Sequence, residues 1–341
     1  PKWLRRQIGS IYLASISSTR LHSCVCLRQP ADSKMRVLVA GATGTIGTPL
    51  VKALVAQADS VVVVGRSKER ICEVFGDSVL AETWDSLTDE HLSNLDAVIN
   101  LAGENVGGVM RWTSDYMKSI LDSRLETTSK LARRLAECGS KARLINASGI
   151  SIYGHQEYDD EEIKDEDSTV PKSHQDFLTD VTIQWEAATQ TSALPETSLV
   201  LLRIGIVICP GGGALGKMEL PFKLGLGGRL GPGTQAMSWI SLEDAVRAIC
   251  FILSRLEIHG PVNLVSGFVP QMEFAEALAA ALHRPCLLPA PSFALRMVLG
   301  SEMAQNLVLV NHRIAAKRLR ASGFEFEDVD LPSVMTRMYA T

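Results

Sequence analysis

The sequence predicts an α/β protein with a Rossmann-type, doubly wound parallel sheet and a smaller carboxyl-terminal α/β portion. Two features of its 341 residues predict this class. Short apolar runs rich in valine and isoleucine alternate with segments of helical periodicity, which is typical of parallel sheets covered by helices on both faces. The first apolar run also leads directly into a glycine-rich turn and then a helical segment. That order of strand, turn and helix is the first unit of a doubly wound fold.

The first unit begins at residues 35 to 40, MRVLVA, whose β-branched and apolar residues predict a buried strand. GATGTIG follows, and TPLVKALVAQ then has helical spacing. In such a turn one glycine permits the tight bend, a second lets the backbone approach a diphosphate, and a third lets the helix pack on the strand. We expect the diphosphate of a dinucleotide to contact Gly41, Thr43, Gly44, Thr45, Ile46 and Gly47.

The second strand, VVVV at residues 61 to 64, leads into Gly65 and Arg66. An NAD site usually has an acid at this position, because a carboxylate accepts hydrogen bonds from the ribose hydroxyls. This chain has a guanidinium instead, with Lys68 and Arg70 close behind. A guanidinium suits the 2′-phosphate of NADP, which a carboxylate would repel. We therefore predict NADP(H) as the cofactor, and solvated charges after a strand are the alternative reading.

Two later runs, DAVINLAGENV at 96 to 106 and RLINASGISIYG at 143 to 154, predict further buried strands. The first contains Leu101, Ala102 and Gly103, which let the adenosine end of a dinucleotide lie close to the backbone. Between the two runs, residues 117 to 135 have helical periodicity, and this register turns Arg124 back toward the strand ends.

We assign residues 1–34 to a basic leader, 35–210 to an NADP-binding Rossmann domain and 211–341 to a smaller domain.

Several motifs in order, AGATGTIG, NLAGEN, SRLETT, SGISIYG, RIGIV and SWISLEDA, resemble the NAD(P)-dependent epimerase family, an atypical extended group of the short-chain dehydrogenase/reductases. The resemblance continues through PGGGALGKMELPFKLGLGGRLGPG and KRLRASGFEFEDVDL almost to the end of the chain. It implies NADP bound across the strand ends, with a smaller carboxyl-terminal part over the nicotinamide. It also implies cofactor contacts at Gly65, Arg66, Leu101, Ala102, Arg124 and Val207.

The stretch DFLTDVTIQWE, residues 176 to 186, departs from that resemblance because it contains no tyrosine and no lysine. Active members use a tyrosine with a lysine four residues later, whose ammonium lowers the pKa of the phenol. If Glu186 is the glutamate that usually follows, Thr182 occupies the lysine position and Leu178 the tyrosine position. Gly149 stands where the serine hydroxyl usually is, with Ser148 beside it. We therefore leave the catalytic residues unassigned.

Substitute catalytic groups are conceivable at Tyr153, Ser148 and Glu186, which lie on segments near the expected nicotinamide. The competing interpretation makes Tyr153 a packing residue at a strand end and Glu186 a partner in a structural ion pair. We favour that interpretation for both residues.

The run EYDDEEIKDED, residues 157 to 167, holds eight acids in eleven residues. It is typical of a solvated loop because like charges repel. Its position also leaves room for a cationic substrate or a basic docking partner. Residues 211 to 233 contain nine glycines, too many for one continuous helix, and predict a pliable loop over a pocket.

The composition gives no indication of nucleic acid as a partner: 34 basic and 38 acidic residues give a net charge of −4. Arg203 interrupts the longest apolar run, which is shorter than the roughly 18 to 20 residues of a membrane span. The seven histidines show no metal-binding spacing, and the seven cysteines form no CxxC pair. Metal binding is therefore not expected.

The leader, residues 1 to 34, carries five basic residues before its first acid, Asp32, and resembles an organellar presequence. A disordered basic tail is the alternative. We expect an ordered leader that lies against a partner. This leads to one hypothesis, an NADP-binding structural or regulatory component such as an accessory subunit of a mitochondrial, membrane-associated assembly. The second hypothesis is an NADP-dependent reductase or epimerase that acts on an unidentified small molecule through substitute groups.

Overall fold

A computed structural model describes residues 34 to 340, except 58, 173–175 and 191–198. The basic leader lies outside the described residues, so its predicted order and its predicted contact with a partner stay predictions. Within the described part, none of the helices combines the length and the hydropathy that a bilayer span requires.

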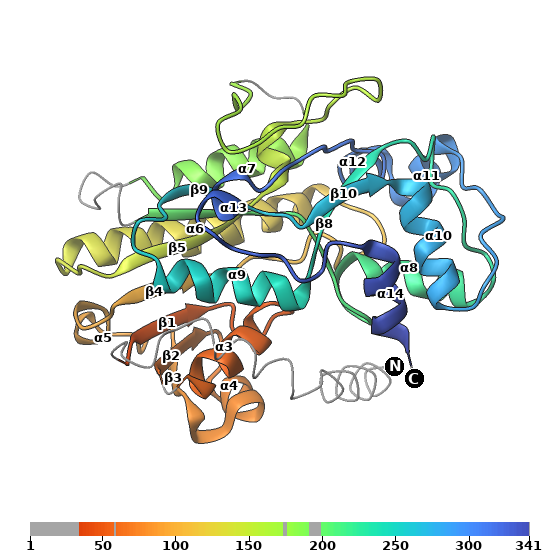
Figure 1. Ribbon diagram of the computed structural model, residues 1–341. Coiled ribbons are helices and arrows are strands. Elements are labelled where there is room, and N and C mark those ends of the chain that lie inside the picture. The colour runs from red at the N-terminus through yellow and green to blue at the C-terminus, as the bar shows by residue number, and fades with distance from the viewer. Residues whose placement is uncertain (1–33, 58, 173–175, 191–198, 341) are drawn as a thin grey trace.

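A seven-stranded sheet forms the centre of the molecule (Figure 1). In spatial order its strands are β3 (Leu80–Thr83), β2 (Ser60–Gly65), β1 (Arg36–Ala40), β4 (Ala97–Asn100), β5 (Arg143–Gly149), β6 (Leu199–Ile204) and β9 (Gly260–Leu264). Every neighbouring pair is parallel. The strand order reverses between β1 and β4, as in a doubly wound sheet. The predicted fold class is therefore confirmed.

Helices cover both faces of this sheet. The elements that alternate with its strands are α3 (Gly47–Ala56), α4 (Lys68–Phe75), the short turn η2 (Gly76–Ser78), α5 (Asp89–Ser93), α6 (Ser114–Glu137), η3 (Ile150–Tyr153), α7 (Phe177–Ala187) and α9 (Leu242–Ser254). Alternate residues of β1 point to opposite faces: Val37 and Val39 pack with α3 and α9, whereas Leu38 and Ala40 pack with α6. Burial on both faces explains why the strand sequences are almost entirely apolar.

A second, three-stranded sheet lies beside the large one and contains β7 (Ile206–Ile208), β8 (Ala236–Ser241) and β10 (Gly267–Pro270). The helices α8 (Gly213–Lys223), α10 (Gln271–Ala281) and α14 (Leu331–Tyr339) pack beside it. The helix α11 (Ser292–Leu299) contacts α12 (Ser301–Leu307), which packs against α7, and α13 (Lys317–Ala321) packs against β9 of the large sheet. The chain crosses between the sheets, since β9 joins the large sheet after β8 has joined the small one. The boundary at residue 210 between the Rossmann domain and the smaller domain stays a prediction.

The glycine-rich segment is more regular than the sequence suggested. The prediction of a loop throughout residues 211 to 233 is wrong for α8, because this helix buries Leu215, Glu219 and Phe222 on one face. Glu219 holds the helix in place by accepting hydrogen bonds from Tyr339 Oη, at 2.8 Å, and from the backbone N–H of Gly211. Tertiary burial therefore overrides the low helix propensity of this segment.

Candidate functional site

The glycine turn has the close backbone packing that was predicted for a dinucleotide cradle. Gly41 has a φ of +75°, and a Cβ there would lie 2.6 Å from the carbonyl carbon of Leu101 and 2.7 Å from the nitrogen of Ala102. A Cβ at Gly47 would lie 2.4 Å from the carbonyl oxygen of Gly41. A side chain at either position would force the first helix away from the strand ends. Glycine is therefore a steric requirement of this turn.

The tip of the turn is open to a ligand. Thr43, Gly44 and Thr45 are exposed, whereas the residues on either side of the turn are buried. The helix α3 follows with Ile46 at its N-cap position, where no side chain accepts a hydrogen bond from the helix. The N–H of Thr48 donates to the carbonyl oxygen of Gly44 at 3.0 Å, whereas the N–H groups of Ile46 and Gly47 and the positive end of α3 remain available to phosphate oxygens. The residues present fit a diphosphate.

Arg66 lies just beyond the carboxyl end of β2 and is exposed. The two cations behind it already have acidic partners. Lys68 Nζ lies 3.0 Å from Glu82 Oε2, and Arg70 NH1 lies 2.9 Å from Glu73 Oε2. Among the residues that the structure describes, Arg66 has no such acidic partner. It is therefore the cation of the three that is available to a 2′-phosphate.

Arg124 faces the end of β4, as its predicted helical register required. Its NH1 donates hydrogen bonds to the carbonyl oxygens of Glu104, at 3.0 Å, and Ile120, at 2.9 Å. Its guanidinium lies over the ring of Trp185, 4.9 Å from the ring centroid. A Cβ at Gly103 would lie 3.2 Å from the guanidinium carbon. Burial lowers the pKa of Arg124 to about 10, partly offset by the charge of Glu104, so the side chain is cationic at neutral pH.

Val207 is the last of the predicted contact residues and lies in β7, immediately after the large-sheet strand β6. Since β1, β2, β4, β5 and β6 are parallel, their carboxyl ends meet at one edge of the sheet. The predicted contact residues lie at or just beyond the ends of β1, β2, β4 and β6, except Arg124, which reaches the end of β4 from α6. The structure brings the predicted positions together at this edge. Their individual contacts with a cofactor stay predictions.

Sequence reasoning missed one neighbour of the glycine turn. A Cβ at Gly212 would lie 3.6 Å from Cγ2 of Thr45, so the loop before α8 lies beside the exposed tip of the turn. Gly211 and Gly213 both have positive φ, which shapes this second glycine loop. No spacing in the sequence links two segments so far apart in the chain.

The positions expected to hold a catalytic serine, tyrosine and lysine lie together at the end of β5. A Cβ at Gly149 would lie 3.3 Å from Cγ2 of Thr182. Leu178 is buried one helical turn before Thr182 on α7. The Thr182 hydroxyl donates to carbonyl oxygens within α7, at 2.7 Å to Leu178 and 3.0 Å to Thr179. None of these three side chains changes charge near neutral pH.

Glu186 forms a buried ion pair, as we predicted from its place in the helix. Arg203 Nε donates to Glu186 Oε1 and Arg203 NH2 to Glu186 Oε2, both at 2.9 Å. Ser148 Oγ also donates to Oε1, at 2.7 Å. Burial alone would lower the pKa of Arg203, but the hydrogen bonds and charge of Glu186 more than offset it and hold that pKa above its ordinary value. Glu186 and Ser148 thus belong to a structural contact.

Tyr153 belongs to the same buried network and is only 1% exposed. Its hydroxyl donates to Asn263 Oδ1 at 2.8 Å and accepts from Arg203 NH1 at 3.0 Å. Burial raises the pKa of the Tyr153 phenol, although the charge of Arg203 opposes the rise. This burial agrees with the interpretation of Tyr153 as a packing residue at a strand end, which stays a prediction.

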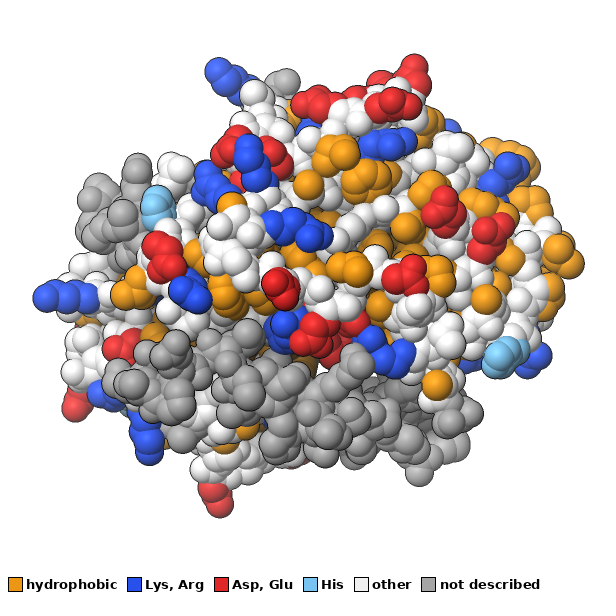
Figure 2. All heavy atoms as spheres, in the orientation of Figure 1, with side chains coloured by type: hydrophobic (Ala, Val, Ile, Leu, Met, Phe, Trp, Pro, Cys, Tyr) orange, Lys and Arg blue, Asp and Glu red, His pale blue; other side chains and the backbone are white. Residues whose placement is uncertain are grey.

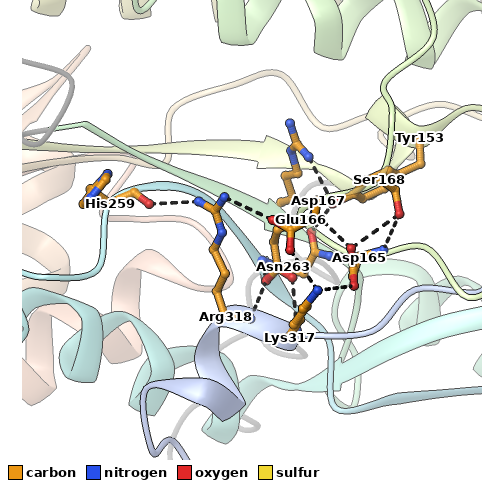
Figure 3. A network of polar contacts seen from close by, with 10 residues as sticks. Tyr153, Asp165, Glu166, Asp167, Ser168, His259, Asn263, Lys317 and Arg318 are labelled. Carbon is orange, nitrogen blue, oxygen red and sulfur yellow. Dashed lines mark hydrogen bonds and ion pairs between the residues drawn. The ribbon is translucent and has the colours of Figure 1, made fainter.

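The acidic run is bound to the carboxyl-terminal part of this same chain (Figure 3). Glu166 is buried and accepts hydrogen bonds from the backbone N–H groups of Asn263, at 2.9 Å, and Lys317, at 3.0 Å. Lys317 Nζ lies 2.8 Å from Asp167 and 3.4 Å from Asp165. Cations of α13 thus occupy the end of the run that could have received a basic partner. The earlier acids of the run, at residues 157 to 162, are mostly exposed, as expected of a solvated loop.

Two remaining expectations concern other ligands. In the described part of the chain, no three or more histidine, cysteine, aspartate or glutamate side chains form a group that could hold a metal ion. The five described cysteines are free thiols, and burial raises the pKa of the Cys209 thiol to about 11. Cys209 therefore stays protonated at neutral pH.

Comparison with known proteins gives consistent matches. The profile of the NAD dependent epimerase/dehydratase family matches residues 37–264, and that of a domain of unknown function (DUF1731) matches residues 290–337. Epimerase family protein SDR39U1 of Bos taurus is 36% identical over 315 residues, which is 90% of this chain and 100% of the relative. Epimerase family protein Mb2239 of Mycobacterium bovis is 37% identical over 293 residues, covering 85% of this chain and 93% of the relative.

A solved structure is also similar. The crystal structure of human epimerase family protein SDR39U1 (isoform 2) with NADPH is 33% identical to this chain and has a TM-score of 0.77. The match covers 89% of this chain and 99% of the human chain.

The doubly wound parallel sheet and the glycine turn at its carboxyl edge define a Rossmann-type α/β protein with a cradle for a dinucleotide. Within that class, the chain belongs to the NAD dependent epimerase/dehydratase family. The family identified from the sequence motifs is confirmed.

Proposed function

We propose that this protein binds NADP(H) and does not carry out the proton transfer that active members of its superfamily perform. The cofactor part of the proposal is supported by the glycine turn, the uncapped α3 and the available cation Arg66. It is also supported by the human relative, which was solved with NADPH. The diphosphate would lie on the turn, and Arg66 would neutralise the 2′-phosphate.

The single observation that carries the second part is the cluster of Gly149, Leu178 and Thr182. These residues occupy the expected catalytic positions: Thr182 lies against Gly149, and Leu178 lies one helical turn before Thr182 on α7. A glycine, a leucine and a threonine whose hydroxyl is bonded to its own helix offer no acid or base near pH 7. The bound nicotinamide would therefore lack the usual proton partner.

A protein that keeps the cofactor site but lacks the catalytic proton donor has a role that is structural or regulatory. We propose that the protein is a component of a mitochondrial, membrane-associated assembly, which NADP(H) stabilises or regulates. The support for mitochondria and for a partner is the basic, acid-poor composition of residues 1 to 31. Cofactor binding stabilises a folded protein by mass action, so an NADP(H) site can act as a structural element or as a sensor.

The alternative function is an NADP-dependent reductase or epimerase that uses substitute groups. The three groups considered for that role are hydrogen-bonded to other buried side chains. Glu186 accepts hydrogen bonds from Ser148 and Arg203, and Tyr153 bonds to Arg203 and Asn263. Releasing any of them would break a buried hydrogen-bond network, which makes this alternative the weaker one.

Turnover separates the two functions. The purified protein is incubated with NADPH and a panel of carbonyl compounds and nucleotide sugars, and NADPH oxidation and sugar interconversion are measured alongside NADPH binding. Tight binding without turnover supports the proposal. Steady turnover that the Tyr153→Phe variant loses, while it still binds NADPH, would reject it.

A further inference from the structure

An apolar surface lies on the small-sheet side of the molecule, far along the chain from the cofactor turn. More than half of the large hydrophobic side chains that are exposed in the described part of the chain come from two short segments, residues 220–226 and 287–298. In α11, Phe293 is 67% and Met297 69% exposed, and this helix has no buried residue. Such a concentration is unusual for a surface that faces only water.

The two segments form one continuous surface. They run parallel to each other, and their paired residues keep the same separation in the sequence. Arg284 Nε donates a hydrogen bond to the carbonyl oxygen of Lys223 at 3.1 Å, and the N–H of Leu288 donates to the carbonyl oxygen of Gly227 at 3.2 Å. One pair further on, the N–H of Ala290 donates to the carbonyl oxygen of Arg229 at 2.8 Å. The exposed Leu224 and Leu226 therefore lie on one strand of this pairing and the exposed Leu287 and Leu288 on the other, between the end of α8 and the start of α11. Figure 1 shows the two helices at the same end of the molecule.

We call residues 213–230 and 282–298 the apolar ribbon surface. It is basic although the whole chain is acidic. The basic residues of the surface are Lys217, Lys223, Arg229, Arg284 and Arg296, all exposed. Its one acid, Glu219, is buried in a contact with Lys223 at 2.7 Å. The neighbouring helices α10 and α12 add three exposed acids, Glu273, Glu276 and Glu302, so the excess of positive charge lies on the ribbon segments themselves, in a chain whose net charge is −4. Figure 2 shows hydrophobic side chains gathered on this end of the molecule, with both basic and acidic side chains among them.

A cavity of about 250 Å³ opens on the ribbon, lined by Arg229, Met272, Cys286, Leu287 and Pro289. Its lining combines the guanidinium of Arg229 with the apolar side chains of Met272, Leu287 and Pro289. This combination suits a group with a negatively charged head and an apolar remainder.

Two other occupants fit the charge poorly. In a twofold dimer the same positive surface would face itself, and like charges would repel. The leader of this chain is also basic, with five cations before Asp32. Charge complementarity therefore requires an anionic occupant.

We propose that the apolar ribbon surface binds the interface of an anionic lipid bilayer. Exposed apolar side chains on short helices, with long basic side chains around them, are the arrangement of segments that lie in the plane of a membrane. Phe293, Met297 and Leu287 would enter the acyl boundary, while the lysines and arginines reach the lipid phosphates. The binding is peripheral and needs no transmembrane helix.

Vesicle flotation with the full chain tests this proposal. The protein is mixed with vesicles of phosphatidylcholine alone or of phosphatidylcholine with phosphatidylglycerol. We expect partitioning into the anionic vesicles that weakens as salt is raised, because the attraction to the phosphates is screened. The Phe293→Ser/Met297→Ser variant should lose at least roughly ten-fold in partitioning, since two apolar side chains no longer leave water. Lys217→Glu/Arg296→Glu, which changes two exposed cations of the surface, should weaken binding to the anionic vesicles.

Matched controls keep the test specific. Leu256→Ser removes a 71% exposed leucine elsewhere, and Arg133→Glu reverses an exposed charge on α6. Both should bind as the wild type does, and all variants should keep the wild-type thermal midpoint. Failure of the wild type to float with anionic vesicles would overturn the proposal. So would equal flotation of the ribbon variants and the controls, because binding would then come from the leader that all of them share. Binding of the apolar ribbon surface to a second copy of the chain or to an acidic protein, with no binding to lipid, would also overturn the proposal.

Discussion

The change Glu186→Gln tests whether the buried carboxylate is structural. It removes one charge from the contact between α7 and β6 and leaves the size of the side chain almost unchanged. Arg203, which is 5% exposed, would then be left as a buried cation without its carboxylate. The glutamine would also place an amide N–H₂ where one of the two 2.9 Å hydrogen bonds is now accepted.

The expected cost follows from this geometry. Removing one partner of a buried ion pair typically costs about 3 to 5 kcal/mol, because the remaining charge is desolvated without compensation. The contact here is bidentate and includes the hydrogen bond from Ser148, so we expect a loss of roughly 4 kcal/mol in the free energy of unfolding. Replacing the pair by apolar groups, Glu186→Met with Arg203→Met, should cost less than Glu186→Gln alone, because no buried charge remains.

Urea denaturation followed by circular dichroism measures this cost. The control is Glu137→Gln, which removes a carboxylate 3.9 Å from Arg133 in a pair whose side chains are both exposed. That change should cost less than about 1 kcal/mol. A loss below 1 kcal/mol for Glu186→Gln, accompanied by loss of a measured turnover, would refute the structural assignment and make Glu186 a catalytic group.

Three further predictions concern the turn, pH and the acidic run. Gly41→Ala should abolish NADPH binding in a titration, because its Cβ would collide with the strand end, whereas Gly139→Ala, with a similar φ but open space, should cost only about 1 kcal/mol and leave binding intact. Burial, with a smaller contribution from the charge of His155, lowers the pKa of His312 from 6.5 to about 4. The unfolded chain therefore binds this proton first, and stability should be full above about pH 6.5 and decline by up to roughly 3 kcal/mol toward pH 4. His312→Gln should flatten that part of a pH series of unfolding midpoints, and an unchanged slope would contradict the assignment. In thermal melts Glu166→Ala should cost about 3 kcal/mol because it leaves buried N–H groups without an acceptor, and Lys317→Ala should cost less than about 1 kcal/mol because that cation is exposed; equal losses would contradict this reading.

The sheet could be predicted from the sequence because its signals are local. In β1 every residue after Arg36 is buried on one face or the other, and this requires an unbroken apolar run that is visible in the sequence. The spacing of the glycines in the first turn is equally local, and Gly47 contacts Gly41 and Ala42 of the same turn, whereas the contact of Gly41 with Leu101 is visible only in the structure. The family resemblance then supplied positions such as Arg124 and Val207, which no local pattern would have found.

Other features depend on contacts between distant segments. Glu166 is buried because Asn263 and Lys317, about 100 and 150 residues later, donate their N–H groups to it, and no spacing in the acidic run encodes this. The helix α8 forms despite its glycines because Glu219 accepts hydrogen bonds from Gly211 and Tyr339, which lie at the two ends of the carboxyl-terminal region. Likewise, the apolar ribbon surface arises only where residues 223 to 229 pair with residues 284 to 290.

The most direct test of the account is the affinity of the protein for NADPH and NADH, measured by calorimetry for the wild type, for Arg66→Ala and for Arg70→Ala. Arg66 is expected to hold the 2′-phosphate, whereas Arg70 is paired with Glu73. We expect the wild type to bind NADPH more tightly than NADH. Arg66→Ala should lower this preference by roughly ten-fold or more, because a charge-assisted hydrogen bond contributes about 1.5 to 3 kcal/mol. Arg70→Ala should keep the wild-type preference. No binding of either nucleotide by the wild type, or an unchanged preference in Arg66→Ala, would contradict it.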